Sequence, residues 1–459
     1  MRRVLLALAL LAAAPGELPP GTRLGLLVVD ADGRELVAER ADERFVPASN
    51  AKLFTAAAAF ATLDTAAPDA AGGATVRLEG RDVVLAGHGD ARLSSAPDCR
   101  VDCLAELARA VAARTRVVRD VIGDDTAFPD ERWPAGMSWN NMAGRYGTAI
   151  SALTVDDNAV AVTVTPGARD GAAATVRGDG YYRVESRVVT TGARAVLDAT
   201  RVPGSDLLRV AGTVPAGAPT TLAVAVDDPA HRAAWRLAAL LRAAGVRVSG
   251  RVMVQHRPLT DADDPARRGG AHVARAPEPA VLARLTPPPL AEDLRATMKA
   301  SQNLHAELLL RRVGAVRGSG SVADGQAAVR AMLDRAGVAR AAAEFADGSG
   351  MSNYDRITPR AAVTLLRWTQ AQPWGAAFRD TLPVGAVDGT LARRFADTPL
   401  AGKVFAKTGS LNAANALSGF LVAASGRTLT FSALANDMAD DASATRAIDR
   451  ALVEIAARN

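Results

Sequence analysis

The alternation of apolar and polar residues near the N-terminus predicts a hairpin followed by a helix. Within residues 22–46, the apolar runs "LGLLVV" and "ELVAE" flank the turn signal Asp32-Gly33, a pattern typical of a β-hairpin. The next stretch, "PASNAKLFTAAAAF" (47–60), changes to helical spacing. We expect a helix that begins near Ser49. Its buried face would carry the apolar residues Leu53, Phe54, Ala57 and Phe60.

The middle of the chain has a different texture. From residue 73, short β runs such as "ATVRLEG" and "RDVVLAGHGD" are separated by Gly and Asp, and the helical stretch "CLAELARAVAARTRV" follows them. Residues 168–221 are rich in Val and Thr without helical periodicity, which predicts a small all-β module. The stretch "DPAHRAAWRLAALLRAAGVRVSG" then returns to a helix followed by a strand.

The last third of the chain begins at the proline-rich "LTPPPLAEDLRATMKAS" (285–301), which marks entry into another domain. Long helical stretches follow, then a strand pair around "KVFAKTGSL" and "RTLTFSALAN", and a C-terminal helix "ASATRAIDRALVEIAAR". We therefore expect an α/β (α+β) fold with nested insertions. The expected units are one domain from 15–72 and 285–459, an inserted α/β domain from 73–167 and 222–284, and a β-rich domain at 168–221.

The first residues predict export. "MRR" supplies a positive start, "VLLALALLAAA" an apolar stretch and "AAAPGELPPG" small residues with a break, as in a secretory signal peptide over residues 1–14. The apolar run is short for a membrane span, and a retained anchor is the alternative. We expect an exported protein, periplasmic or in the cell envelope, with at most weak membrane association.

Composition limits the classes of partner. The 459 residues carry a net charge of +5, and the basic residues are interleaved with acids without a polybasic run. This argues against nucleic acid as a partner. The five histidines are scattered without the paired spacing of metal ligands, so we expect no metal site. The two cysteines, Cys99 and Cys103, leave a local disulfide open, since on a regular helix their separation is near the upper limit for bridging.

The strongest chemical signal is a lysine. The chain holds 50 arginines and only four lysines, and lysine, unlike arginine, can be made to lose its proton. Lys52 lies three residues after Ser49, on the same face of the expected helix, where an amine can serve as base for a serine nucleophile. A pKa near 7 requires a shift of roughly three units, about 4 kcal/mol, so burial or a second cation is needed. The plainer interpretation is a helix N-cap with a solvated lysine.

Two further stretches carry polar groups at turns or strands. In "MKASQNLHAELLL" (298–310), Ser301 and Asn303 flank one residue at a helix start and can present a hydroxyl and a carboxamide; an ordinary helix start is the alternative. In "FAKTGSLNAANALSGF" (405–420), Lys407, Thr408 and Gly409 lie on an expected strand. There the glycine lets a substrate backbone approach, and Lys and Thr can hold a carboxylate. Lys407 would be the second cation.

Taken in order, Ser-x-x-Lys, Ser-x-Asn and Lys-Thr-Gly are the signature of penicillin-recognising serine acyl-transferases. "FADGSGMSNYDRITP" (345–359), "LPVGAVDGTLARRF" (382–395) and "YGTAISALTVDDNAVAVTVTPG" (146–167) resemble segments of class C low-molecular-mass penicillin-binding proteins. These are the D-alanyl-D-alanine carboxypeptidase/endopeptidases of peptidase family S13. The resemblance covers nearly the whole mature chain and implies a transpeptidase/β-lactamase-like domain.

The resemblance implies a role for each motif residue. Ser49 would attack the carbonyl between two terminal D-alanines, and Lys52 would accept its proton. Ser301 would relay protons to the leaving group. The substrate-binding residues would be Asn303, Lys407, Thr408, Gly409 and Ser410, with the backbone N–H groups of Ser49 and Ser410 as oxyanion hole. The expected partners are peptidoglycan stem peptides and β-lactam antibiotics, and no metal or organic cofactor is required.

One departure from the family pattern concerns substrate choice. Members that bind diaminopimelate side chains often place acids after a tryptophan and an arginine after Gly-Ser-Gly, whereas this chain has Asn140 and Asn141 after Trp139, and Asn353. We hypothesise a third stem-peptide residue other than free diaminopimelate, or a looser pocket. A serine β-lactamase and a non-catalytic cell-wall binding protein of the same fold are the two alternative functions.

Overall fold

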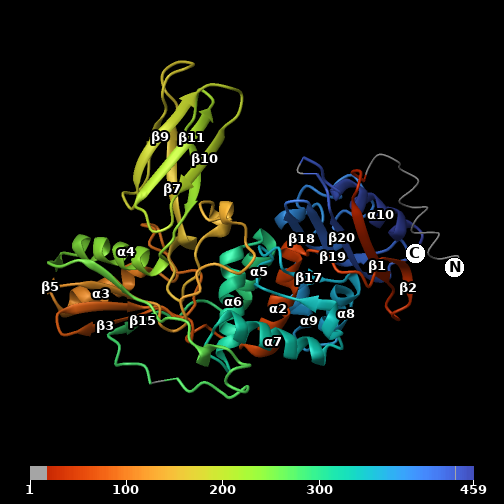
Figure 1. Ribbon diagram of the computed structural model, residues 1–459, viewed down its shortest axis with the longest axis horizontal. Helices are drawn as coiled ribbons and strands as arrows, with labels where there is room; N and C mark the ends of the chain where they lie inside the picture. The colour runs from red at the N-terminus through yellow and green to blue at the C-terminus, as the bar shows by residue number, and fades with distance from the viewer. Residues whose placement is uncertain (1–17, 276, 440) are drawn as a thin grey trace.

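The computed structural model describes residues 18–275, 277–439 and 441–459. The segment 1–14, expected to be a signal peptide, lies outside the described residues. Figure 1 shows a body with helices around a sheet, a second α/β body beside it, and a β module that projects from the second.

The first body is built around a five-stranded antiparallel sheet that joins the two ends of the chain. Its strand order is β18 (Val404–Leu411), β19 (Ala414–Val422), β20 (Thr428–Asn436), β1 (Arg23–Val29) and β2 (Glu35–Glu39). The hairpin of β1 and β2 confirms the alternation at 22–46, and Gly33 takes the positive φ of 86° in its turn.

Helices cover both faces of this sheet. On one face lie α2 (Ala51–Thr62), α5 (Leu290–Ala300), α6 (Asn303–Ala315), α7 (Val322–Arg335), α8 (Pro359–Gln370) and α9 (Gly375–Thr381). On the other lies α10 (Thr445–Ala457). Strand β19 shows why: Ala416 and Phe420 join the first core, while Leu417 and Leu421 join the second, as the two-residue period of a strand requires.

The expected pairing of the last two strands is wrong. β18 and β20 are not neighbours, because β19, with the sequence "ANALSGFLV", lies between them and pairs with both. This strand is buried on both faces, so it lacks the polar alternation that marks a half-exposed strand. The helix over residues 47–60 is confirmed, with Leu53, Phe54, Ala57 and Phe60 all buried.

The second body is an α/β domain inserted between α2 and α5. Its five-stranded sheet has the order β14 (Val252–Gln255), β6 (Val121–Asp124), β4 (Asp82–Ala86), β3 (Thr75–Glu79) and β15 (Ala283–Arg284). The helices α3 (Leu104–Arg114) and α4 (Pro229–Ala243) pack on it. The short strands β5 (Val117–Val118) and β13 (Arg247–Val248) form a separate parallel pair.

The projecting module consists of two three-stranded sheets around one valine-rich core. One sheet contains β10 (Val196–Arg201), β11 (Leu207–Val214) and β9 (Arg183–Thr190), and the other contains β12 (Thr220–Ala225), β7 (Ala159–Thr165) and β8 (Thr175–Arg177). Because β7 and β12 pair with each other and share this core, we propose limits of 159–226 for this domain in place of 168–221. The rest of the division stays a proposal.

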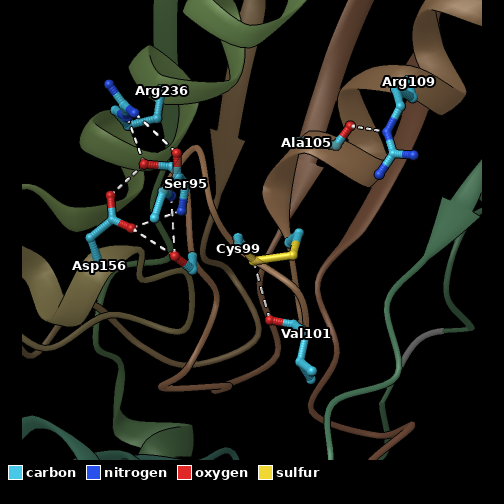
Figure 2. The surroundings of a disulfide bond; sticks show 10 residues. Ser95, Cys99, Val101, Ala105, Arg109, Asp156 and Arg236 are labelled. Carbon is cyan, nitrogen blue, oxygen red and sulfur yellow. Dashed lines mark hydrogen bonds between the residues drawn. A yellow bond between two sulfur atoms is a disulfide. The ribbon is translucent and has the colours of Figure 1, made fainter.

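The two cysteines form a disulfide, Cys99–Cys103 (Figure 2). The segment between them is not a regular helix, since Asp102 has a φ of 58° and Cys103 is the extended residue before α3. This local geometry brings the two Cα atoms to 5.8 Å, inside the range that a disulfide bridges.

Candidate active site

The serine of the first motif lies where a 3-10 turn, η1 (Ala48–Asn50), runs into α2. Ser49 is partly buried, and the residue before it, Ala48, has a φ of 46°. Positive φ is costly for a residue with a side chain and is maintained only where its surroundings fix it. Here Gly350 supplies the room, because a Cβ on this glycine would overlap the Ala48 carbonyl oxygen.

The Lys52 amine lies inside the protein and faces Ser49. The residue is 1% exposed, and Nζ lies 2.9 Å from Ser49 Oγ, 2.6 Å from Asn303 Oδ1 and 2.6 Å from the Ser349 carbonyl oxygen. A charged ammonium would donate to all three oxygens. A neutral amine would donate to Asn303 and Ser349 and accept the hydroxyl proton of Ser49, which is the arrangement of a general base.

Burial lowers the pKa of Lys52 to about 8. The nearby carboxyl groups of Asp347, Glu307 and Asp355 oppose this shift, because negative charge favours the ammonium form. The neutral amine is therefore accessible near neutral pH. The structure meets the requirement for a lowered pKa chiefly by burial.

A buried carboxyl group orders the loop behind Lys52. Glu307, on α6, accepts hydrogen bonds from the backbone N–H groups of Gly348 (3.0 Å) and Ser349 (2.9 Å), and it is 2% exposed. Burial and the neighbouring Asp347 raise the pKa of Glu307 to about 7. Glu307 thus fixes the peptide whose carbonyl oxygen accepts from the Lys52 amine.

The second motif lies at the junction of two helices. Helix α5 ends at Ala300, Ser301 adopts a left-handed φ of 61°, and α6 begins at Asn303. This turn directs the Ser301 hydroxyl to the Lys407 amine at 2.9 Å. The Asn303 carboxamide accepts from Lys52 and donates from Nδ2 to the carbonyl oxygen of Tyr146 at 2.9 Å.

The third motif lies on β18, an edge strand of the central sheet. Lys407 is fully buried, and its amine also donates to the Thr408 carbonyl oxygen at 2.8 Å. Burial and the positive charge of Lys52 lower the pKa of Lys407 well below its ordinary value. The Thr408 hydroxyl donates a hydrogen bond to the Thr390 hydroxyl oxygen at 2.7 Å.

At Gly409, β18 passes close to the backbone of the nucleophile. A Cβ on this residue would lie 2.7 Å from the Pro47 carbonyl oxygen and 3.1 Å from the Ser49 nitrogen, so a larger residue would displace the strand. Ser410 follows, exposed, opposite Asn415 in the ladder. Hydrogen bonds thus link Ser49, Lys52 and Asn303 in one group and Ser301 and Lys407 in another. Thr408, Gly409 and Ser410 follow Lys407 on the same strand.

Comparison with known proteins decides the family. The sequence model of the D-Ala-D-Ala carboxypeptidase 3 (S13) family matches residues 7–459. A D-alanyl-D-alanine carboxypeptidase of Actinomadura sp. (strain R39) is 35% identical over 448 residues, which is 91% of this chain and 78% of the relative. The chain belongs to the S13 family.

More distant relatives agree. The D-alanyl-D-alanine carboxypeptidase DacB of Haemophilus influenzae is 24% identical over 90% of this chain and 85% of the relative. The crystal structure of penicillin binding protein 4 from the same organism superposes with a TM-score of 0.79 at 21% identity, covering 96% of this chain and 97% of that one; this shows the fold alone. The resemblance drawn from the three motifs, the fold class and the serine-hydrolase class are confirmed.

Several residues that complete the site carried no assigned role in the sequence. Ser349 and Thr390 lie within "FADGSGMSNYDRITP" and "LPVGAVDGTLARRF", the stretches that resemble the family, and this resemblance was the available signal. Tyr146 opens the third such stretch, "YGTAISALTVDDNAVAVTVTPG". Glu307 gave no such signal, because a charged residue on a helix is an ordinary surface residue until the fold buries it.

Metal clusters and membrane-spanning helices are both absent from the described part of the chain. Among residues 18–275, 277–439 and 441–459, no cluster of three His, Cys, Asp or Glu side chains could hold a metal ion, and no helix within these ranges is long and apolar enough to span a bilayer. The expectation that catalysis needs no metal or organic cofactor stays a prediction.

Proposed function

We propose that this protein is a serine-type D-alanyl-D-alanine carboxypeptidase/endopeptidase that cleaves peptidoglycan stem peptides through an acyl-enzyme and is acylated by β-lactams. The observation that carries the proposal is the buried Lys52 amine 2.9 Å from Ser49 Oγ, with its pKa lowered to about 8. Membership in the S13 family and the D-alanyl-D-alanine carboxypeptidases among its relatives support the same activity.

In the acylation step, Ser49 Oγ attacks the carbonyl carbon between the two D-alanines while its proton passes to the neutral Lys52 amine. The carbonyl oxygen becomes an oxyanion, which we assign to the backbone N–H groups of Ser49 and Ser410. The C–N bond then breaks as the proton held by Lys52 passes through Ser301 to the leaving D-alanine nitrogen, which makes the Lys52 amine neutral again. The product is an ester on Ser49 and free D-alanine, or the amine of a cross-linked strand.

In the second step, water attacks the ester carbonyl and gives a proton to Lys52. The C–O bond to Ser49 then breaks, Lys52 returns the proton to Ser49 Oγ, and the shortened peptide leaves with a new terminal carboxyl group. Asn303 would hold the substrate amide, since its carboxamide already bridges Lys52 and the Tyr146 carbonyl oxygen. Lys407 and Thr408 would bind the terminal carboxylate. A carboxylate beside Lys407 stabilises the ammonium form, so substrate binding would raise the lowered pKa of Lys407.

The cellular setting is part of the proposal. The N-terminal residues resemble a signal peptide, and the family consists of D-Ala-D-Ala carboxypeptidases. We propose an exported enzyme, periplasmic or in the cell envelope, with stem peptides and β-lactams as partners and at most weak membrane association.

A labelled penicillin tests the nucleophile. Mass spectrometry of the intact protein should show one penicilloyl adduct on the wild type, located on the peptide that carries Ser49, and no adduct on Ser49→Ala. An unlabelled wild type would favour the non-catalytic binding protein. A long-lived adduct distinguishes the peptidase from a β-lactamase, which would release it quickly and accumulate hydrolysed penicillin.

Defined muropeptides test the reaction. Release of D-alanine from pentapeptides shows carboxypeptidase activity, and separation of dimers into monomers shows endopeptidase activity. If penicillin labels the protein but the protein forms neither product, the proposed substrate is wrong.

Substrate choice at the third stem-peptide residue follows from two loops that meet. Met137 and Ser352 form a β-bridge, and the Asn353 nitrogen donates to the Gly136 carbonyl oxygen at 2.9 Å. This brings the neutral Asn353 close to the segment that holds Asn140. We propose a preference for third residues other than free diaminopimelate. Turnover of Lys-, ornithine- and diaminopimelate-containing peptides tests it, and a strong diaminopimelate preference would contradict it.

A further inference from the structure

A three-residue turn of the inserted domain contacts the second motif of the active site. Asp156, Asp157 and Asn158 all have left-handed φ values, of 53°, 54° and 49°. Three consecutive residues with side chains rarely adopt this conformation, and it persists only where the surrounding structure fixes it. The contacts of the turn show what fixes it and what it holds.

The turn is anchored to the inserted domain through its first and last residues. Asn158 is fully buried and donates from Nδ2 to the Ala149 carbonyl oxygen at 3.0 Å. The Asp156 carboxylate accepts from the Ser95 backbone N–H at 2.7 Å and from the Ser95 hydroxyl, and Arg236 donates to that same hydroxyl oxygen at 2.7 Å (Figure 2).

The segment Ser94-Ser95, which binds the Asp156 carboxylate, is itself held in place by the disulfide loop. The Ser94 nitrogen donates to the Asp102 carbonyl oxygen at 3.0 Å, inside the loop closed by the Cys99–Cys103 disulfide. These contacts that anchor the turn all come from the inserted domain.

The middle residue, Asp157, extends across to the catalytic domain. Its Oδ2 accepts from Gln302 Nε2 at 3.2 Å, and its Oδ1 lies 3.0 Å from His305 Nε2. Gln302 is the residue between Ser301 and Asn303, and His305 lies on the first turn of α6. One carboxylate thus holds both the residue inside the motif and the helix that follows it.

The histidine in this contact is a charged link. His305 is 5% exposed, and its Nδ1 lies 2.6 Å from Asp293 Oδ1 on α5 while its Nε2 faces Asp157. Because both ring nitrogens face carboxylate oxygens, both must donate, which requires imidazolium. Burial opposes the charge, but the two carboxylates outweigh it and raise the pKa of His305 to about 10. Asp293, His305 and Asp157 therefore tie α5, α6 and the inserted domain together around Ser301.

We propose that Asp157 is a positioning residue through which the inserted domain holds Ser301 and Asn303 in their catalytic places. The inference rests on the roles assigned to these two residues in the proposed function. Ser301 is the single left-handed residue that joins α5 to α6. Its hydroxyl must stay within hydrogen-bond reach of the Lys407 amine. A displacement of about 1 Å at such a group can cost about a hundredfold in rate.

The chain offers a matched control inside the inserted domain. His256 also lies between two carboxylates, with Nδ1 2.9 Å from Asp125 Oδ1 and Nε2 3.2 Å from Asp228 Oδ2, and Arg132 Nη2 lies 3.0 Å from the same Nε2. The two side chains raise the pKa of His256 to about 10 as well. Asp228 precedes α4 and caps it. Neutralising Asp228 removes its ion pair with His256, and this pair lies in the inserted domain, away from the three motifs.

The test compares Asp157→Asn with Asp228→Asn. Asparagine tolerates positive φ and caps helices well, so each change removes a charge without straining the backbone. We expect Asp157→Asn to lower the acylation rate constant for benzylpenicillin about tenfold, with a smaller change in the dissociation constant of the complex that precedes acylation. Asp228→Asn should keep the wild-type acylation rate while losing at least as much thermal stability.

A double-mutant cycle sharpens the assignment. If Asp157 acts partly through His305, the loss in Asp157→Asn combined with His305→Gln is smaller than the product of the two single losses. A wild-type acylation rate in Asp157→Asn would overturn the proposal, and so would equal losses of rate in Asp157→Asn and Asp228→Asn. An unlabelled wild type would instead overturn the proposed function, so the two failures are distinguishable.

Discussion

The two halves of the active site hold the same pair of groups, a buried lysine amine and a serine hydroxyl, in different surroundings. Behind Lys52 lie three buried carboxyl groups that favour its ammonium form, and its pKa is lowered to about 8. Among the described residues, Lys407 donates to Ser301 Oγ and the Thr408 carbonyl oxygen. No carboxylate contributes to its pKa, which is lowered well below its ordinary value.

This contrast explains how two buried lysines in one active site can have different roles, one as a base and one as a carboxylate-binding group. A base must lose and regain a proton near neutral pH, so the local negative charge around Lys52 keeps its two forms close in free energy. A carboxylate-binding amine needs its charge only when the ligand is present. On the Lys407 side, the missing negative charge would be that of the substrate.

The most severe loss of activity is expected at the Lys52 half. Ser49→Ala and Lys52→Ala should each lower acylation by penicillin by about 10⁴-fold or more, since the nucleophile and its base act as a unit. Stopped-flow or mass-spectrometric acylation rates measure this. If Lys52→Ala is still acylated within about tenfold of the wild-type rate, another residue is the base, and the contrast drawn between the two lysines is wrong.

The Lys407 half should be sensitive to the charge of the ligand. Lys407→Ala is expected to lower turnover of peptides with a free terminal carboxylate by about 10² to 10³-fold, because a charge-assisted pair and the contact to Ser301 are both lost. Peptides with an amidated C-terminus, already poor substrates, should lose much less. Equal losses of turnover for both peptides would show that Lys407 does not bind the carboxylate.

Proton uptake gives a second measure on the same half. Binding of a D-Ala-D-Ala peptide to Ser49→Ala should be coupled to proton uptake in the pH range where Lys407 titrates, because the carboxylate raises the lowered pKa of Lys407. Calorimetry in two buffers of different ionisation enthalpy detects it. Binding without proton uptake at any pH at which the protein stays folded would mean that the carboxylate does not lie beside Lys407.

The pH dependence separates the two halves more finely. Since the neutral Lys52 amine is the base and its pKa is about 8, acylation should rise about tenfold per unit below pH 8 and level off above it. Glu307→Gln keeps an acceptor for the Gly348 and Ser349 N–H groups but removes a charge that raises the pKa of Lys52. The rising limb should therefore move to lower pH by about one unit. An unmoved or upward-shifted limb would contradict the assignment.

A mild effect is expected at the edge of the Lys407 half. Thr390→Ala removes the acceptor 2.7 Å from the Thr408 hydroxyl. This exposed hydrogen bond is worth about 1 kcal/mol or less. We expect KM for D-Ala-D-Ala peptides to rise about threefold with kcat nearly unchanged. A large fall in kcat would place Thr390 closer to the chemistry than its contacts indicate.

Much of the fold could be predicted where a local pattern specifies a structure. The hairpin turn at Asp32-Gly33 and the buried face of α2 follow from residue periods that depend only on nearby positions. Strand β19 was missed because a strand buried on both faces shows no alternation. The disulfide also had to wait for the structure, because its geometry depends on one left-handed residue, Asp102.

The order of residues along the chain was enough to establish which groups are available: a serine and a lysine one helical turn apart, a Ser-x-Asn turn, and a Lys-Thr-Gly strand. Their chemistry was settled only when the chain folded. Folding buried Lys52 beside three carboxyl groups and set Asp157 of the inserted domain against His305. The cause is that desolvation and charge–charge interactions depend on distances in space, which packing sets between residues hundreds of positions apart.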